Sequence, residues 1–284
     1  MNMARPRVAF QGERGAFSEE AAVKLLGADV QLVPCATFEE LFAAVDAGHA
    51  DYALAPIENS LAGSVHRTYD LLLQSTLHIT SEVIIPIAHH LIGNSQSSLE
   101  TICVVESHPV ALAQCEGFFL AHPRIRRVAT DDTAASVRRV MESGDPTRAA
   151  IAGSRAAAIY GGTILSEHLE DHKENYTRFV LLTPEPGVCK DANKLSLVLR
   201  LSHQPGALHS ALEPFANRAI DLLKIESRPV VGQPWQYRFY LDLSAASNEP
   251  KVAQALAELR ERAAEVRLLG CYPAAQAKTL GKQM

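Results

Sequence analysis

Short apolar runs alternate with helical patterns over roughly the first 185 residues. A capping box at Thr37-Phe-Glu-Glu40 predicts a helix start, and Gly48 closes that helix. A helix also begins around Ser18, where acidic residues follow in the first turn. Alternating strands and helices predict a layered α/β domain. The predicted strands are Val8–Phe10, Tyr52–Ala55, Ile102–Val105, Ala149–Ala152 and Phe179–Leu182.

Three of these strands lead through a serine, at Ser60, Ser107 and Ser154, into a predicted helix. Such junctions place backbone N–H groups and a hydroxyl at the carboxyl edge of a sheet, where helix dipoles favour anions. Simple N-capping explains any single serine better. Three together favour a small ligand with several negative charges, such as a dicarboxylate.

A different pattern begins after the loop Thr183-Pro-Glu-Pro-Gly187. Residues 193–273 read in the order strand, helix, strand, strand, helix, strand, with Gly206 opening the first helix. That order predicts a ferredoxin-like sandwich. Its sheet is exposed on one side, which favours pairing with another subunit. Residues 274–284 form a tail.

Composition narrows the possible functions. With 284 residues, of which 47% are hydrophobic, the chain can bury the cores of two domains. The net charge of −5 and the scattered basic residues argue against a nucleic-acid partner. No signal peptide is apparent, and the longest apolar stretch, Val83–Ile92, is too short to cross a membrane. Five cysteines without a Cys-x-x-Cys pair indicate reduced thiols, so we expect a cytoplasmic protein.

An ordered set of motifs carries a resemblance to a known family. The set comprises Gly12-Glu-Arg-Gly-Ala-Phe-Ser18, Pro56-Ile-Glu-Asn-Ser60, Ser107-His-Pro109 with Gln114, and Asn175-Tyr-Thr-Arg-Phe179. Together they resemble prephenate dehydratases over residues 7 to 273. The resemblance implies that residues 1–187 form a two-lobed catalytic domain, like a type 2 periplasmic binding protein with its active site in the cleft. The C-terminal part resembles a phenylalanine-binding ACT domain.

The activity implied is the conversion of prephenate to phenylpyruvate. Prephenate carries two carboxylates and a ring hydroxyl, and loss of CO2 and water makes its ring aromatic. Aromatisation supplies driving force, so the enzyme mainly fixes the dianion and helps hydroxide leave as water. We expect no metal and no organic cofactor. The sequence has no His-Glu-x-x-His pattern, and Gly12-x-x-Gly15 lacks the dinucleotide-binding spacing.

The resemblance makes Thr177 the catalytic residue. A threonine hydroxyl is a very weak acid, so it would act as an oriented hydrogen-bond donor to the departing hydroxyl. Apart from this resemblance, Thr177 would be interpreted as an ordinary strand residue, since threonine is common in β-strands. Arg178 can hold a carboxylate through its planar fork, although it alternates with Thr177 across the strand. The remaining predicted substrate-binding residues are Glu58, Asn59, Ser60, Ser107, His108, Gln114, Ser154 and Phe179.

The ACT resemblance implies that L-phenylalanine binds as an effector between subunits of a homo-oligomer, a dimer or tetramer. The implied effector residues are Gly206, Ala207, Leu208, Asp221, Glu226, Ser227 and Arg228. Two positions depart from the family: Ala16 stands where a hydroxyl residue is common, and Asp221 stands where members commonly have Asn. The second change leaves the identity of the effector open.

Two other functions compete with this one. An arogenate dehydratase performs the same elimination on the transaminated substrate, and the sequence does not separate the two. A non-catalytic protein could use the same cleft to sense or carry a small anion. The lack of a signal peptide argues against a periplasmic carrier, and Thr177-Arg-Phe179 in its full context argues for catalysis.

Overall fold

A computed structural model describes residues 5–187, 191–246 and 248–275. The chain forms two compact units, one made of Met1–Leu71 with Val83–Phe179 and the other of Leu72–Glu82 with Val180–Met284. Residues 276–284 of the predicted tail, like Cys189, lie outside the described residues. No helix in the described ranges has the length and hydropathy needed to span a bilayer.

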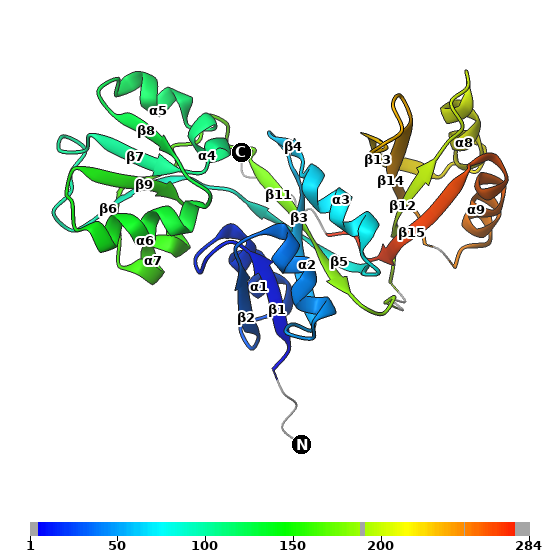
Figure 1. The fold of residues 1–284 in the computed structure, drawn as a ribbon, viewed down its shortest axis with the longest axis horizontal. Coiled ribbons are helices and arrows are strands. Elements are labelled where there is room, and N and C mark those ends of the chain that lie inside the picture. The colour runs from blue at the N-terminus through cyan, green and yellow to red at the C-terminus, as the bar shows by residue number, and fades with distance from the viewer. Residues whose placement is uncertain (1–4, 188–190, 247, 276–284) are drawn as a thin grey trace, which may run out of the picture. The chain divides into compact units, whose positions relative to one another are not determined.

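The first sheet has the strand order β2-β1-β3-β11-β5, with β4 added to β3 (Figure 1). Strand β1 runs parallel to both β2 and β3, and α1 and α2 pack against β1 and β3. The elements are β1 (Arg7–Gln11), α1 (Phe17–Leu26), β2 (Gln31–Cys35), α2 (Phe38–Asp46), β3 (Tyr52–Asn59), β4 (Gly63–Ser64), α3 (His66–Gln74), β5 (His78–Pro86) and β11 (Tyr176–Thr183).

The predicted capping box is present at the start of α2. Thr37 Oγ1 accepts a hydrogen bond from Glu40 N at 3.1 Å, and the Glu40 carboxylate accepts one from Ala36 N at 2.9 Å. The carboxylate therefore reaches one residue further back than the simplest form of the motif. Gly48 follows the helix with φ of 69°, as its role in ending the helix requires.

The second sheet has the order β10-β6-β9-β7-β8 and belongs to the first unit (Figure 1). Strand β7 is parallel to β8 and β9, while β6 is antiparallel to β9 and β10. Its elements are β6 (His90–Gly93), β7 (Val104–Ser107), α4 (Pro109–Ala113), α5 (Glu116–Ala121), β8 (Arg126–Ala129), α6 (Thr133–Ser143), β9 (Arg148–Ala152), α7 (Ser154–Tyr160) and β10 (Thr163–Ser166). Six strands of the two sheets, β2, β4, β5, β6, β8 and β10, were not predicted.

Two of the three predicted strand–serine–helix junctions are present, after β7 and after β9, whereas the one at Ser60 is wrong. Strand β3 continues to Asn59 and forms a hairpin with β4, so Ser60 does not lead into a helix. Ser107 ends β7 and is fully buried, and its hydroxyl donates to Ile151 O at 2.6 Å. At α7 the N-cap is Gly153, and Ser154 is already inside the helix. None of the three serines is therefore an N-cap.

The second unit contains an antiparallel sheet of order β13-β14-β12-β15. Its elements are β12 (Lys194–Arg200), α8 (Ala207–Ala216), β13 (Asp221–Pro229), β14 (Tyr237–Ser244), α9 (Pro250–Arg262) and β15 (Glu265–Tyr272). This is the predicted element order. Both helices lie on one side of the sheet, where Leu195, Leu197 and Leu199 of β12 pack in the same core as Ala211 of α8 and Leu256 of α9 (Figure 1).

Pro214 lies inside α8, where it has no N–H to give to the carbonyl of Ser210. The guanidinium of Arg262, on α9, donates to that carbonyl at 2.7 Å and to the Glu213 carboxylate at 2.6 Å. Arg262 of the neighbouring helix thus supplies the hydrogen bond that Pro214 cannot give to the Ser210 carbonyl.

Residues 72–82 are tightly held within the second unit. Lys194 Nζ lies 3.0 Å and 3.1 Å from the two carboxylate oxygens of Glu82, and both side chains are buried. Arg267 donates to the carbonyls of Leu73 and Ser75. At Gly270 the backbone approaches so closely that an added Cβ would lie 2.0 Å from Ile79 O. Only glycine fits there without movement of the backbone.

We therefore expect Gly270→Ala to lower the free energy of unfolding by about 1–3 kcal/mol, the usual cost of overpacking against groups that cannot rotate away. Urea denaturation followed by far-UV circular dichroism measures the change. Gly117→Ala is the matched control, since its Cβ would meet only the end of the Asp171 side chain, at 2.8 Å. Equal stability of the Gly270→Ala variant and the wild type would contradict the close approach of the two backbones.

Candidate active site

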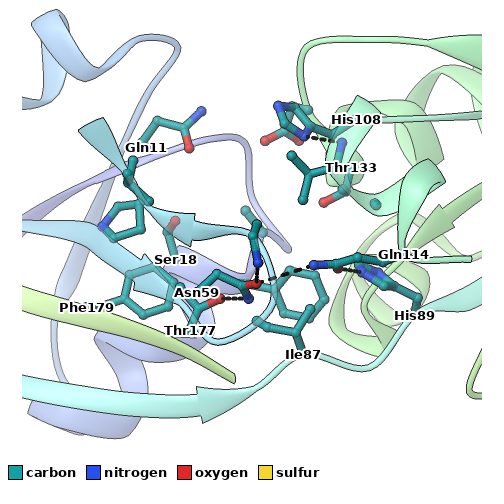
Figure 2. Close-up of a pocket in the computed structure, with 18 of the residues that line it drawn as sticks. Gln11, Ser18, Asn59, Ile87, His89, His108, Gln114, Thr133, Thr177 and Phe179 are labelled. Carbon is teal, nitrogen blue, oxygen red and sulfur yellow. Dashed lines mark hydrogen bonds between the residues drawn. The ribbon is translucent and has the colours of Figure 1, made fainter. Parts of the chain in front are cut away.

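The first unit contains a cavity of about 410 Å³ between elements of its two sheets (Figure 2). Strands β3 and β11 and helix α1 supply one wall, and helices α4 and α6 supply the other. Residues that line it are Gln11, Ala16, Phe17, Ser18, Phe38, Pro56, Asn59, Ala62, Gly63, Ser64, Val65, Ile87, His89, His108, Val110, Ala111, Gln114, Asp131, Asp132, Thr133, Thr177 and Phe179.

Strand β11 presents alternate side chains to the cavity. Thr177 and Phe179 line it and are 9% and 2% exposed. Arg178 lies between them in sequence and is absent from the lining; its Nη1 donates to Glu58 Oε2 at 3.2 Å. The period of two along a strand thus separates the threonine from the arginine.

The amide of Asn59 has a fixed orientation. Its Oδ1 accepts hydrogen bonds from the backbone N–H groups of Leu61 at 3.0 Å and Ala62 at 2.8 Å. Nδ2 must therefore be the donor to Thr177 Oγ1 at 3.0 Å and to Asn175 Oδ1 at 2.8 Å. Since Thr177 Oγ1 accepts from Asn59, its own proton is free to point elsewhere. No acceptor for that proton is found among residues 5–187, 191–246 and 248–275.

The same chain of hydrogen bonds continues through two further amides to a histidine (Figure 2). Asn175, which is fully buried, donates from Nδ2 to Gln114 Oε1 at 2.9 Å. Gln114 Nε2 donates a long hydrogen bond of 3.4 Å to Asn59 Oδ1, and His89 Nε2 lies 2.9 Å from Gln114 Oε1. Groups from β3, the C-cap of α4 and the entry to β11 are thereby joined in one network.

Charge in the cavity comes from carboxylates. The described lining residues include Asp131 and Asp132 but no lysine or arginine. Burial raises the pKa of Asp132, although its carboxylate also accepts from backbone N–H groups at the start of α6. Burial lowers the pKa of His108 and outweighs the two neighbouring aspartates. The groups best placed to bind an anion are therefore neutral donors, among them the hydroxyls of Ser18 and Thr133.

The structure brings together five of the predicted substrate-site residues, since Asn59, His108, Gln114, Thr177 and Phe179 all line the cavity. The other five, Glu58, Ser60, Ser107, Ser154 and Arg178, are not in the lining. Their contact with substrate stays a prediction.

Ser60 forms hydrogen bonds that hold the start of β11. Its hydroxyl donates to Glu174 O at 2.8 Å and accepts from Tyr176 N at 2.9 Å. Its backbone N–H also donates to Tyr176 O at 2.8 Å. Ser60 therefore fixes the start of β11, one residue before Thr177.

A second hollow, of about 140 Å³, lies in the second unit at the start of α8. Ala207 and Leu208 of the predicted effector site line it, with Leu201, Ser202, His203, Gln204, Gln236, Tyr237 and Phe239. Gly206 precedes them as the N-cap with φ of 81°. The other predicted effector residues, Asp221, Glu226, Ser227 and Arg228, lie on β13 outside this lining, and their role stays a prediction.

Sequence reasoning missed two members of the hydrogen-bond network. Asn175 stands in the motif Asn175-Tyr-Thr-Arg-Phe179, so a signal was present although its role was not recognised. His89 lies in the apolar run Val83–Ile92, and only the fold places it beside Gln114.

The chain is similar to known proteins over most of its length. The sequence profile described as "Prephenate dehydratase" matches residues 8–187. "Arogenate dehydratase/prephenate dehydratase 1, chloroplastic" of Arabidopsis thaliana is 42% identical over 283 residues, covering 94% of this chain and 72% of the relative.

Two solved structures are similar over nearly the whole chain. Prephenate dehydratase from Arthrobacter aurescens, in complex with L-Phe, has a TM-score of 0.85 and 34% identity, covering 94% of this chain and 89% of its own. GqqA, described as a novel type of quorum quenching acylase, has a TM-score of 0.86 and 33% identity, covering 95% and 98%. The matched profile and the extent of these similarities show that the chain belongs to the prephenate dehydratase family.

Proposed function

We propose that the chain catalyses the decarboxylating dehydration of prephenate to phenylpyruvate, a carbon–oxygen lyase reaction, and that the cavity of the first unit is its active site. One observation carries the assignment of the catalytic group. Thr177 Oγ1 accepts from Asn59, so the threonine proton is available to a ligand in the cavity that Thr177 lines. Membership of the family supplies the substrate class.

The chemistry requires a proton at the departing oxygen. As the bond to the lost carboxylate breaks, its electron pair enters the ring and the ring C–O bond breaks, which releases CO2 and hydroxide. Thr177 donates a hydrogen bond to that oxygen and relays to it a proton taken up from solvent, so the oxygen leaves as water and the threonine hydroxyl is restored. Asn59 holds the oxygen of Thr177 in place and thus sets the direction of the donated proton.

Substrate carboxylates would be held by neutral donors. Ser18, Thr133 and the Gln114 amide all line the cavity and can donate hydrogen bonds to carboxylate oxygens. The raised pKa of Asp132 lessens its repulsion of a dianion, because the buried carboxyl is more easily protonated.

We also propose that the chain is divided into two domains. Residues 1–187 would form the two-lobed domain resembling type 2 periplasmic binding proteins, which the chain path supports: it leaves the first sheet after β5, forms the second sheet, and returns at β11. Residues 193–273 would form the ACT domain. The order β13-β14-β12-β15, with both helices on one side, supports that assignment.

We also propose that L-phenylalanine regulates the enzyme. It would bind at ACT domains that pair in a homo-oligomer, and the protein would be cytoplasmic. The related prephenate dehydratase from Arthrobacter aurescens was solved in complex with L-Phe. In this chain, Ala207 and Leu208 line a hollow next to Gly206, whose N-cap position leaves backbone N–H groups at the start of α8.

We expect Thr177→Val to bind prephenate with a nearly normal KM but to lose about a hundredfold or more in kcat, because valine is close in shape and lacks only the hydroxyl. Thr177→Ser, which keeps the hydroxyl, is the matched control and should retain much of the turnover. Formation of phenylpyruvate against a no-enzyme control at neutral pH measures both. Near-normal turnover by Thr177→Val would refute the role of Thr177, and parallel assays with arogenate compare the two substrates.

We expect Ala207→Tyr to abolish L-phenylalanine binding by filling the hollow, while His209→Tyr, at an exposed neighbour outside the lining, binds normally. Calorimetry on the full-length protein, with L-tyrosine as comparison ligand, measures both. The full chain is needed because truncation near residue 187 would remove Lys194 and leave Glu82 buried without its cation. Undiminished binding to Ala207→Tyr would place the effector elsewhere.

A further inference from the structure

We infer that His89 is a positioning residue for the reaction, acting through Gln114. Its imidazole Nε2–H donates to Gln114 Oε1 and so keeps the Gln114 amide nitrogen directed toward Asn59 and the cavity (Figure 2). This inference rests on the proposed function. His89 lies in the link between β5 and β6 and lines the same cavity as Gln114 and Thr177.

The direction of this hydrogen bond follows from the backbone of the β3–β4 hairpin. The N–H groups of Leu61 and Ala62 require Asn59 Oδ1 to be an acceptor, which makes Asn59 Nδ2 the donor to Asn175 Oδ1. Asn175 Nδ2 must then donate to Gln114 Oε1. Because Gln114 Oε1 can only accept, His89 Nε2 must carry a proton.

The remaining nitrogen of the ring identifies the protonation state. His89 is 2% exposed, and its Nδ1 has no hydrogen-bond partner within the described part of the chain. A proton on a buried Nδ1 without an acceptor would be costly, so the ring is neutral with its proton on Nε2. Burial is also the main cause that lowers the pKa of His89, which agrees with a neutral ring.

The ring is held rigidly enough to orient its neighbour. The backbone N–H of His89 donates to Glu170 Oε2 at 2.7 Å, and its carbonyl accepts from Leu169 N at 2.8 Å. The Phe17 ring meets the imidazole edge-on, with centroids 5.8 Å apart. Backbone and ring are thus both fixed, as a positioning group requires.

Gln114 needs this second donor. Its Oε1 is held by Asn175 and His89, whereas its Nε2 makes only a long contact of 3.4 Å with Asn59 Oδ1. Without His89, only the hydrogen bond from Asn175 and the long contact with Asn59 would hold the Gln114 amide, which could then rotate its N–H groups away from the cavity. The expected effect is a lower kcat with little loss of protein stability.

Two substitutions separate a positioning role from an acid–base role. The amide nitrogen of glutamine can occupy the place of His Nε2, whereas that of asparagine can reach only the place of Nδ1. We expect His89→Asn to lower kcat for prephenate by about tenfold or more, as the loss of an oriented donor does. We expect His89→Gln to restore kcat to within about threefold of wild type, a range too small for the loss of an acid–base group.

Two controls exclude a general structural effect. His90 is the neighbouring histidine, also buried with a Nδ1 that lacks a partner among the described residues, but it does not line the cavity. His90→Asn should keep wild-type kcat while its melting temperature changes about as much as that of His89→Asn. In a Gln114→Ala background, His89→Asn should cost no further activity, because His89 acts through Gln114.

Two results would overturn the positioning role of His89. Equal damage in His89→Gln and His89→Asn would show that the imidazole itself is needed, and additive losses with Gln114→Ala would show that it does not act through Gln114. If wild-type protein fails to convert prephenate, the proposed function fails instead. Nitrogen-15 NMR of the wild-type histidines then still tests the contact: a neutral His89 ring protonated on Nε2 is expected at pH 7.5, and a proton on Nδ1 would refute it.

Discussion

Two backbone N–H groups, those of Leu61 and Ala62, set the direction of the hydrogen bonds that link Asn59 to Thr177, Asn175, Gln114 and His89. They donate to Asn59 Oδ1, and an inverted Asn59 amide would face them with its own N–H groups. Both hydrogen bonds are exposed, so water could satisfy the two N–H groups instead, and each bond favours this orientation by about 0.5–1.5 kcal/mol. The orientation of Asn59 is therefore favoured before any ligand binds, and Asn59 in turn donates to Thr177.

This constraint depends on the hairpin that extends β3. Because β3 continues to Asn59 and pairs with β4, the chain turns back at Leu61 and Ala62 and presents their N–H groups to the Asn59 side chain. Ser60, within the same turn, fixes the start of β11. One short hairpin thus positions both the donor to Thr177 and the strand that carries Thr177, although the two lie more than 100 residues apart in sequence.

The sequence correctly predicted the helix starts that depend only on neighbouring residues. The capping box at Thr37 and the helix start at Gly206 depend on neighbouring residues only, and both are present. Alternation along β11 predicted that Thr177 and Arg178 face opposite ways, but alternation alone does not say which one faces the ligand. That choice depends on Glu58, which lies on another strand and pairs with Arg178. His89 was missed for the same reason, since its partner Gln114 is brought to it only by the fold.

The pairing of Arg178 with Glu58 has a consequence for catalysis under the proposed function. One substrate carboxylate leaves as CO2, so its negative charge disperses as the reaction proceeds. A cation fixed beside that carboxylate would stabilise the substrate more than the transition state, and only stabilisation that grows toward the transition state raises the rate. The described lining of the cavity holds hydroxyl and amide donors and no lysine or arginine, which avoids that penalty. Charge instead develops at the departing oxygen, and Thr177, oriented by Asn59, is the group whose proton is available there.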